Sequence, residues 1–158
     1  MKNLIVVLLG GLSGEREISF LTGKACSKAL KKKGYKVKLL DAKGSFVSKL
    51  KSLKPKLVFN ALHGRYGEDG IIQGFLESLK IPYTHSGVQA SSIAMDKNLA
   101  KICFKEAGIP VVEHIILDES YSLKNIPFRL PYVIKPLAGG SSVDVKILKN
   151  ENDWQPIK

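Results

Sequence analysis

Residues 4–19 read LIVVLLGGLSGEREIS, and this stretch decides how the chain begins to fold. The run LIVVLL (4–9) is continuously apolar, which is typical of a parallel strand covered on both faces. Two glycines end the strand, and a helix is predicted from about Glu15 to Lys33, ended by Gly34. The stretch therefore predicts a strand, a glycine-rich turn and a helix, which is how an α/β fold begins.

The same alternation of strands and helices continues as far as residue 85. The further predicted strands cover 35–40, 56–62 and 81–85, and the further predicted helices cover 46–53 and 70–79. The order β-α-β-α-β-α-β predicts an N-terminal parallel sheet with flanking helices, joined by right-handed crossovers.

Three glycine-rich stretches, at 10–14, 63–70 and 84–87, each follow a predicted strand. The carboxyl ends of parallel strands meet at one edge of the sheet, so we expect these stretches to gather there. Sheets of this kind bind their ligands at that edge.

The pattern changes near residues 90–96. Asp96 is a good N-cap for a helix within 95–110, a strand is predicted at 111–117, and 130–148 reads as strand, glycine-rich loop and strand. The final residues, NENDWQPIK (150–158), look like the beginning of another helix. We predict an α/β domain at 1–95 and an incomplete second domain at 96–158, because the second stretch is a thin basis for a core of its own.

The chain is strongly basic, with 25 Lys+Arg against 14 Asp+Glu and a formal charge of +11. This balance suggests acidic partners such as nucleic acid, anionic lipid or phosphorylated small molecules. The lysines are spread out, and the densest run, KKKGYKVK (31–38), lies where lysines complement a helix dipole. No nucleic-acid recognition motif accompanies the charge, so we expect a solvated surface and no nucleic-acid partner.

No segment is long enough to cross a membrane, so no membrane partner is predicted. The apolar run from Leu4 to Leu9 is too short for a signal peptide, and no cleavage site follows it. Cys26 and Cys103 lie far apart without metal-ligand spacing, and we expect reduced core thiols and a cytoplasmic location.

The motif GGLSGEREIS (10–19) has neither the ending of a P-loop nor the spacing of a dinucleotide site. Two interpretations stay open. The stretch is a capped helix start, or Glu15 points over the sheet edge to hold a cationic group such as an amine. Arg16 and Glu17 are interpreted as helix-surface and packing residues.

A second motif, NALHGRYGEDGIIQG (60–74), places His63 at the end of a predicted strand. His63 is either a hydrogen-bonded structural group or part of a site, and Asp69 is predicted to cap the next helix. No second histidine or cysteine stands at ligand spacing, so a zinc site is not expected.

The third and fourth motifs carry lysines. In YVIKPLAGGSSVDVK (132–146), Lys135 precedes a Gly-Gly-Ser-Ser loop whose amides and hydroxyls suit a nucleoside triphosphate, although a plain β-hairpin is the alternative. Lys97 lies at the very start of a helix, where a cation opposes the dipole unless it faces a bound phosphate.

In this order and spacing, the motifs resemble the D-alanine–D-alanine ligases of the ATP-grasp superfamily. The matching stretches are GGLSGEREIS, ALHGRYGEDGIIQG, PYTHSGVQASSIAMDK, AGIPV and VIKPLAGGSSV, which extend over residues 4 to about 148. The resemblance implies a Rossmann-like domain followed by the first part of an ATP-grasp domain. It also implies a homodimer that forms D-alanyl-D-alanine for peptidoglycan through an acyl phosphate, with ATP and Mg²⁺ as cofactors.

The resemblance implies roles for particular residues. Glu15 matches the glutamate that anchors the ammonium group of the first D-alanine, and His63 matches a histidine near that substrate. Lys97 and Lys135 match the lysines that contact ATP phosphates. Ser141 matches a serine that hydrogen-bonds the anchoring glutamate and orients substrate, which makes Glu15 and Ser141 the expected catalytic pair. Gly140 and Ser142 belong to the loop over the phosphates, and no metal ligand is expected in this chain.

The sequence departs from the family pattern at His85 and Asp144, where the family has glycine. We expect an altered turn at His85, and repulsion of a triphosphate by Asp144 unless its side chain points away or meets a metal. A full ligase has about twice this length, so we expect a truncated form that is inactive alone. The alternatives are a ligase for a related D-amino or D-hydroxy acid, and a non-catalytic dimerisation or binding fragment.

Overall fold

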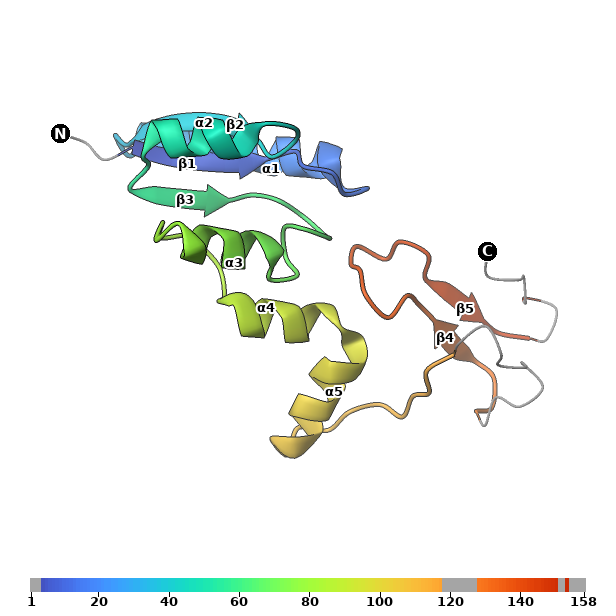
Figure 1. The fold of residues 1–158 in the computed structure, drawn as a ribbon. Helices are drawn as coiled ribbons and strands as arrows, with labels where there is room; N and C mark the ends of the chain where they lie inside the picture. The colour runs from blue at the N-terminus through green and yellow to red at the C-terminus, as the bar shows by residue number, and fades with distance from the viewer. Residues whose placement is uncertain (1–3, 118–127, 151–152, 154–158) are drawn as a thin grey trace. The chain divides into compact units, whose positions relative to one another are not determined.

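The computed structural model describes residues 4–117, 128–150 and 153, and it divides into two compact units, Met1–Met95 and Asp96–Lys158. Each unit is described by itself (Figure 1). The first unit contains a parallel sheet flanked by helices, so the predicted α/β class is confirmed.

Three parallel strands form the sheet of the first unit, in the order β2-β1-β3. β1 (Leu4–Leu9) is central and pairs with β2 (Lys36–Asp41) on one side and with β3 (Leu57–Asn60) on the other. The predicted strand at 81–85 is reduced to one parallel bridge between Tyr83 and Val58. Pro82 offers a carbonyl but no N–H to the ladder, and His85 leaves the extended conformation with φ 82°, so pairing stops there.

Helices cover both faces of this sheet. α1 (Arg16–Lys32) follows β1, α2 (Phe46–Leu53) follows β2, and α3 (Ile71–Ser78) and α4 (Val88–Met95) complete the unit. α1 approaches β1 closely through the buried small residues Ser19, Gly23 and Ser27; a Cβ atom on Gly23 would lie 2.7 Å from Leu9 Cβ. These small side chains therefore allow α1 to pack closely against its face of the sheet.

The main core lies on the opposite face, because successive side chains of a strand point to opposite sides. Val6 and Leu8 of β1 are fully buried there, together with Leu50 of α2 and Leu76 of α3. Residues Ile5 to Leu9 of β1 are all buried, as the apolar run predicts. Burial of this run on both faces fixes the position of the turn that follows it.

The second unit contains α5 (Lys97–Glu106) and an antiparallel pair, β4 (Tyr132–Ile134) and β5 (Lys146–Leu148). Asp96 caps α5 as predicted, because its Oδ1 accepts the N–H groups of Asn98 and Leu99, each at 2.9 Å. The predicted strand, glycine-rich loop and strand at 130–148 are also confirmed.

The strand predicted at 111–117 is wrong. Residues 111–117 form polar contacts with α5 instead. Lys101 Nζ donates to the Val112 carbonyl at 3.3 Å, and His114 Nε2 lies 3.0 Å from Asn98 Oδ1. The alternating sequence favours a strand, but a strand forms only where a second strand lies beside it to share backbone hydrogen bonds. The helix predicted at the end of the chain falls mostly outside the described residues.

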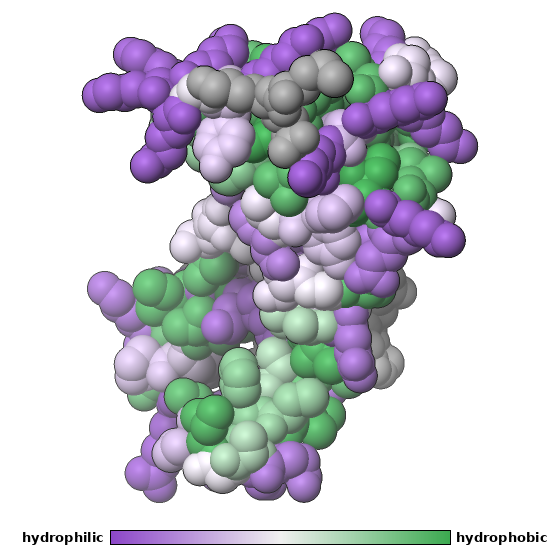
Figure 2. Space-filling view, turned by 90° about the vertical axis from the view of Figure 1, so that its left-hand side faces the viewer, coloured by the Kyte–Doolittle hydropathy of each residue, from purple (hydrophilic) through white to green (hydrophobic). Residues whose placement is uncertain are grey.

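Hydrophilic side chains are prominent on the surface. Figure 2 shows long hydrophilic side chains projecting from one face, with apolar patches between them. Among the described residues, no helix is both long enough and apolar enough to pass through a membrane.

Candidate functional site

The loops that follow β1 and β3 meet at the carboxyl edge of the sheet. Ser13 Oγ in the first loop donates to the His63 carbonyl at 2.7 Å. Ser19 Oγ accepts the Gly10 N–H at 2.8 Å and donates to the Ala61 carbonyl at 2.6 Å, so it joins both loops from α1. The expectation that the first two glycine-rich stretches gather at one edge is confirmed.

The third glycine-rich stretch joins them through His85. Its Nε2 lies 2.9 Å from the Asn60 carbonyl at the end of β3, and its ring meets the Phe59 ring edge to face. All three stretches therefore lie around the carboxyl ends of the strands.

Arg16 and Asp41 hold the turn after β1 in place. The Arg16 guanidinium meets both carboxylate oxygens of Asp41, at 2.9 and 2.6 Å, and also donates to the Gly11 carbonyl at 2.7 Å. Asp41 in turn accepts the Gly11 N–H at 3.1 Å. The interpretation of Arg16 as a helix-surface and packing residue is therefore incomplete, because its side chain also fixes the turn that leads into Glu15.

This ion pair shifts both groups away from their ordinary acidity. The Arg16 hydrogen bond holds the pKa of Asp41 below its usual value, with a further contribution from the Gly11 N–H, while burial opposes the shift. The same hydrogen bond raises the pKa of Arg16. Both partners are therefore charged over the physiological pH range.

Glu15 stands at the N-cap position of α1, but its side chain makes no capping hydrogen bond. Its carboxylate lies against the second loop, since a Cβ atom added to Gly64 would be only 2.9 Å from Glu15 Oε1. Gly64 has φ 68°, and its N–H donates to Glu68 Oε2 at 2.6 Å. Of the two interpretations left open by the sequence, this placement favours a carboxylate that points over the sheet edge.

His63 lies between α1 and the second loop. Its Nε2 is 2.9 Å from Thr22 Oγ1, and its Nδ1 is 3.8 Å from Glu68 Oε1. Asp69, which was predicted to cap α3, accepts the Ile71 N–H at 3.2 Å, although the N-cap residue is Gly70. His63 thus belongs to the same edge of the sheet as Glu15.

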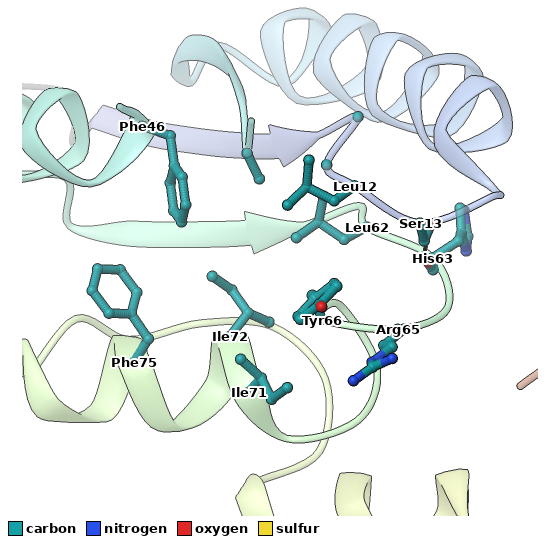
Figure 3. A pocket seen from close by; sticks show the side chains of 13 residues that line it. Leu12, Ser13, Phe46, Leu62, His63, Arg65, Tyr66, Ile71, Ile72 and Phe75 are labelled. Carbon is teal, nitrogen blue, oxygen red and sulfur yellow. Dashed lines mark hydrogen bonds between the residues drawn. The ribbon is translucent and has the colours of Figure 1, made fainter. Parts of the chain in front are cut away.

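An apolar cavity of about 260 Å³ opens beside these loops. Leu12, Leu62, Tyr66 and Ile72 line it near the sheet edge, and Phe46 and Phe75 lie at its other end (Figure 3). The sequence patterns predicted these residues as core or loop and did not reveal the cavity, because its walls come from five separate segments.

In the second unit, Lys97 is tied to the glycine-rich loop. Its Nζ donates to the Gly139 carbonyl at 2.9 Å and to the Leu137 carbonyl at 3.3 Å. Burial, followed by the charge of Lys135, lowers the pKa values of Lys97 and Lys101. Lys135 is therefore close enough to repel both Lys97 and Lys101, an arrangement that an anion would stabilise.

The loop that follows Lys135 is exposed and has unusual backbone angles. Ser141, Ser142 and Asp144 have φ values of 53°, 57° and 56°. The left-handed conformation is unfavourable for residues other than glycine, and it is concentrated at ligand-binding and catalytic loops. Gly140 accepts the Val143 N–H at 3.2 Å within this loop.

The comparisons with known proteins agree with one another. The sequence model of the family described as D-ala D-ala ligase N-terminus matches residues 43–86. A D-alanine–D-alanine ligase from Rhizobium meliloti (strain 1021) is 49% identical over 152 residues, which is 96% of this chain. The chain belongs to the D-alanine–D-alanine ligase family. A second ligase, from Methylocella silvestris, is 48% identical over 156 residues and 99% of the chain.

Solved structures of D-alanine–D-alanine ligases have the same fold. The Bacillus anthracis ligase matches 96% of this chain with a TM-score of 0.81 and 36% identity, and a second structure of it, complexed with ATP, matches with a TM-score of 0.73 and 34% identity. This chain covers 51% of the first of those structures and 49% of the Rhizobium meliloti relative. It therefore spans about half the length of the ligases that it matches.

The two departures from the ligase pattern can now be located. His85 and Asp144 both have a left-handed backbone, with φ 82° and 56°. The backbone at His85 has the conformation that favours glycine, and an altered turn relative to the family stays a prediction. Histidine and aspartate tolerate this conformation better than most residues.

Proposed function

We propose that the protein is a D-alanine–D-alanine ligase that joins two D-alanine molecules through an acyl phosphate formed from ATP, for peptidoglycan synthesis. The observation that carries the proposal is the position of the Glu15 carboxylate against Gly64 at the carboxyl edge of the sheet. Family membership supports the same conclusion.

In this proposal the first unit, 1–95, binds amino acid. The Glu15 carboxylate receives the ammonium group of the first D-alanine by charge-assisted hydrogen bonds. The Arg16–Asp41 pair holds the turn, and Gly64 leaves room that a Cβ atom would fill. His63 lies beside the same substrate.

The stretch 96–158 contributes the first part of an ATP-grasp domain. Lys97 and Lys135 bind the phosphates of ATP, whose negative charge relieves the repulsion between the lysines. Gly140 and Ser142 form the loop over those phosphates, and Ser141 orients substrate. Catalysis then rests on positioning and on electrostatic stabilisation of the transferring phosphoryl group.

Mg²⁺ is the second proposed cofactor, because it neutralises phosphate charge in this class of reaction. In the described parts of the chain, no group of three or more His, Cys, Asp or Glu side chains is placed to hold a metal ion. No described residue is therefore assigned to the metal, and no step is routed through it.

We also propose a cytoplasmic homodimer. Leu12, Tyr66 and Ile71 surround the apolar cavity and are 63%, 41% and 53% exposed, which suits a surface covered by a second copy. Sedimentation of the wild type and of Ile71→Asp tests this state. A wild type that is monomeric at micromolar concentration would contradict it.

The direct test of ligase activity uses two proteins. One is the 158-residue chain, and the other is a chimera in which it is followed by the remaining half of the Bacillus anthracis ligase, of which the chain covers 51%. Phosphate release from ATP is expected to depend on D-alanine in the chimera and to be absent from the chain alone. Turnover by the chain alone, or a folded chimera without D-alanine-dependent turnover, would contradict the proposal.

A matched pair of variants tests the role of Glu15. Glu15→Gln removes the charge that faces the ammonium group and is expected to raise the KM for D-alanine by at least tenfold. Glu17→Gln changes an exposed neighbour on the same helix turn and is expected to leave turnover unchanged. Equal effects of the two substitutions would argue against Glu15 as the anchor.

A further inference from the structure

The ring of His63 is held from two sides by separate elements. Thr22, on the second turn of α1, places its Oγ1 2.9 Å from Nε2. Glu68, in the loop after β3, places Oε1 3.8 Å from Nδ1. The other Glu68 oxygen accepts the Gly64 N–H at 2.6 Å, so the carboxylate is itself fixed.

These neighbours differ in what they can do with a proton. A carboxylate only accepts, so the nitrogen that faces Glu68 is the one that favours the N–H group. A neutral imidazole then has its lone pair on Nε2, and a hydroxyl group can donate to it. The chemistry on the two sides of the ring therefore selects one tautomer.

We propose that Thr22 and Glu68 are positioning residues that hold neutral His63 as the Nδ1–H tautomer, with the Thr22 hydroxyl donating to Nε2. This inference rests on the proposed function only in placing His63 beside the first D-alanine. Nε2 then accepts the Thr22 hydroxyl group, and Nδ1 carries the proton on the side that faces the Glu68 carboxylate, 3.8 Å away. His63 has no lone pair ready for the ammonium proton of the substrate, and it acts through its shape and its fixed dipole.

His85 provides a reference within the same chain. Its Nε2 lies 2.9 Å from the Asn60 carbonyl, and a carbonyl oxygen only accepts. His85 is therefore the Nε2–H tautomer, the opposite of the form assigned to His63. The two histidines flank the end of β3, and their ring nitrogens should give reversed spectra.

The test is nitrogen-15 NMR of the histidine rings in the 158-residue chain, at a pH where imidazole side chains are neutral. His63 is expected to show a pyrrole-type Nδ1 and a pyridine-type Nε2, and His85 the reverse. Substitution of each histidine by glutamine assigns the signals. An Nε2–H tautomer at His63 in the wild type would overturn the proposal.

Three variants separate the two neighbours. Thr22→Val keeps the side-chain shape without the hydroxyl, so the His63 Nε2 resonance is expected to move toward the value of an unbonded pyridine-type nitrogen. Thr22→Ser is expected to retain the wild-type position. Glu68→Gln is expected to increase the Nε2–H population. An unchanged His85 signal shows that a variant is folded, and an unchanged His63 signal in folded Thr22→Val would overturn the role of Thr22.

The effect of these variants on D-alanine binding is measured by the kinetics of the ligase chimera. Loss of one positioning hydrogen bond in Thr22→Val is expected to raise the KM for D-alanine roughly two- to tenfold, with a smaller change in kcat, and Thr22→Ser should restore it. A fall in kcat alone would contradict a positioning role. An inactive chimera would count against the proposed function, whereas the NMR result decides the tautomer independently.

Discussion

The two units of the chain differ in how much of their apolar surface is covered. In the first unit, β1 is buried from Ile5 to Leu9, and α1, α2 and α3 close over it. In the described parts of the second unit, Leu148 is the one buried hydrophobic residue, and α5 buries none of its side chains. Ile102 and Phe104 of α5 remain 49% and 48% exposed.

This difference separates two requirements for a stable element. α5 has a well-formed cap at Asp96 and good helical residues, so its local sequence agrees with its structure. Its apolar side chains nevertheless need a surface to cover them, and most helical stability in proteins comes from such packing. We therefore expect substitutions in the first unit to be costly and equivalent substitutions in α5 to be mild.

The largest expected effect comes from Leu8→Ala in the centre of β1. Leu8 is fully buried, and the loss of its side chain leaves a cavity that should lower the free energy of unfolding by about 2–5 kcal/mol. Leu99→Ala in α5 removes the same atoms from a residue that is 46% exposed, and should lower it by less than about 1 kcal/mol. Urea unfolding followed by circular dichroism measures both, and equal losses would remove the distinction between the units.

The next effect concerns the turn that holds Glu15. Gly64→Ala introduces a Cβ atom at φ 68° and 2.9 Å from Glu15 Oε1, which should cost about 1–3 kcal/mol and displace the carboxylate. Gly14→Ala is the matched control, because its Cβ atom would meet nothing within 4 Å and its backbone is not left-handed. Thermal unfolding of both variants tests whether the site is as tightly packed as the core behind it.

A smaller and pH-dependent effect is expected from Asp41→Asn. Because the Asp41 pKa is lower in the folded chain, the Arg16–Asp41 pair contributes stability above the unfolded pKa and loses it as the pH falls through the folded one. The variant should be about 1 kcal/mol less stable than the wild type near neutral pH, since the pair is 30% and 36% exposed and partly screened.

That difference should shrink as the pH falls below about 4, the ordinary pKa of an aspartate in an unfolded chain. Urea unfolding at several pH values measures it. A stability difference for Asp41→Asn that persists unchanged to pH 2 would show that the ion pair is not its cause.

The smallest effect is expected in the loop of the second unit. Asp144→Gly relieves a left-handed backbone and removes a charge, whereas Asp144→Ala removes the charge alone. Stability should rise by less than about 1 kcal/mol, and only in the glycine variant. If Asp144 repels phosphate, both variants should bind ATP more tightly than the wild type, which calorimetry measures. Unchanged ATP binding in both variants would show that this carboxylate points away from the phosphates.

The sequence predicted correctly the elements that depend on neighbouring residues, and it missed those that depend on contacts between distant residues. The run LIVVLL is β1 without change, and the helix predicted from Glu15 to Lys33 is observed as Arg16–Lys32, because burial and caps act over neighbouring residues. α4 was not predicted, since VQASSIAM has no apolar stripe and is held by contacts such as Ser92 Oγ to the Asp69 carbonyl.

The site shows a similar limit. Glu15 and His63 could be brought to one edge from the sequence, because each follows a parallel strand. The Arg16–Asp41 pair could not, because it joins residues 25 positions apart whose side-chain directions depend on the pairing of β1 with β2. A carboxylate that ends the strand next to a glycine-rich turn is the signal that could have identified Asp41 as a partner.

The position of β2 at the edge of the three-stranded sheet has a consequence for self-association. An edge strand is a template on which another chain can add a strand, and natural proteins discourage this with charged side chains, especially lysine. Lys36 and Lys38 are exposed on β2, so two copies meeting edge to edge would bring positive charges together. Salt screens such repulsion, with a Debye length of about 10 Å at 0.1 M and about 3 Å at 1 M. The solubility of this protein should therefore fall with ionic strength sooner than its stability does.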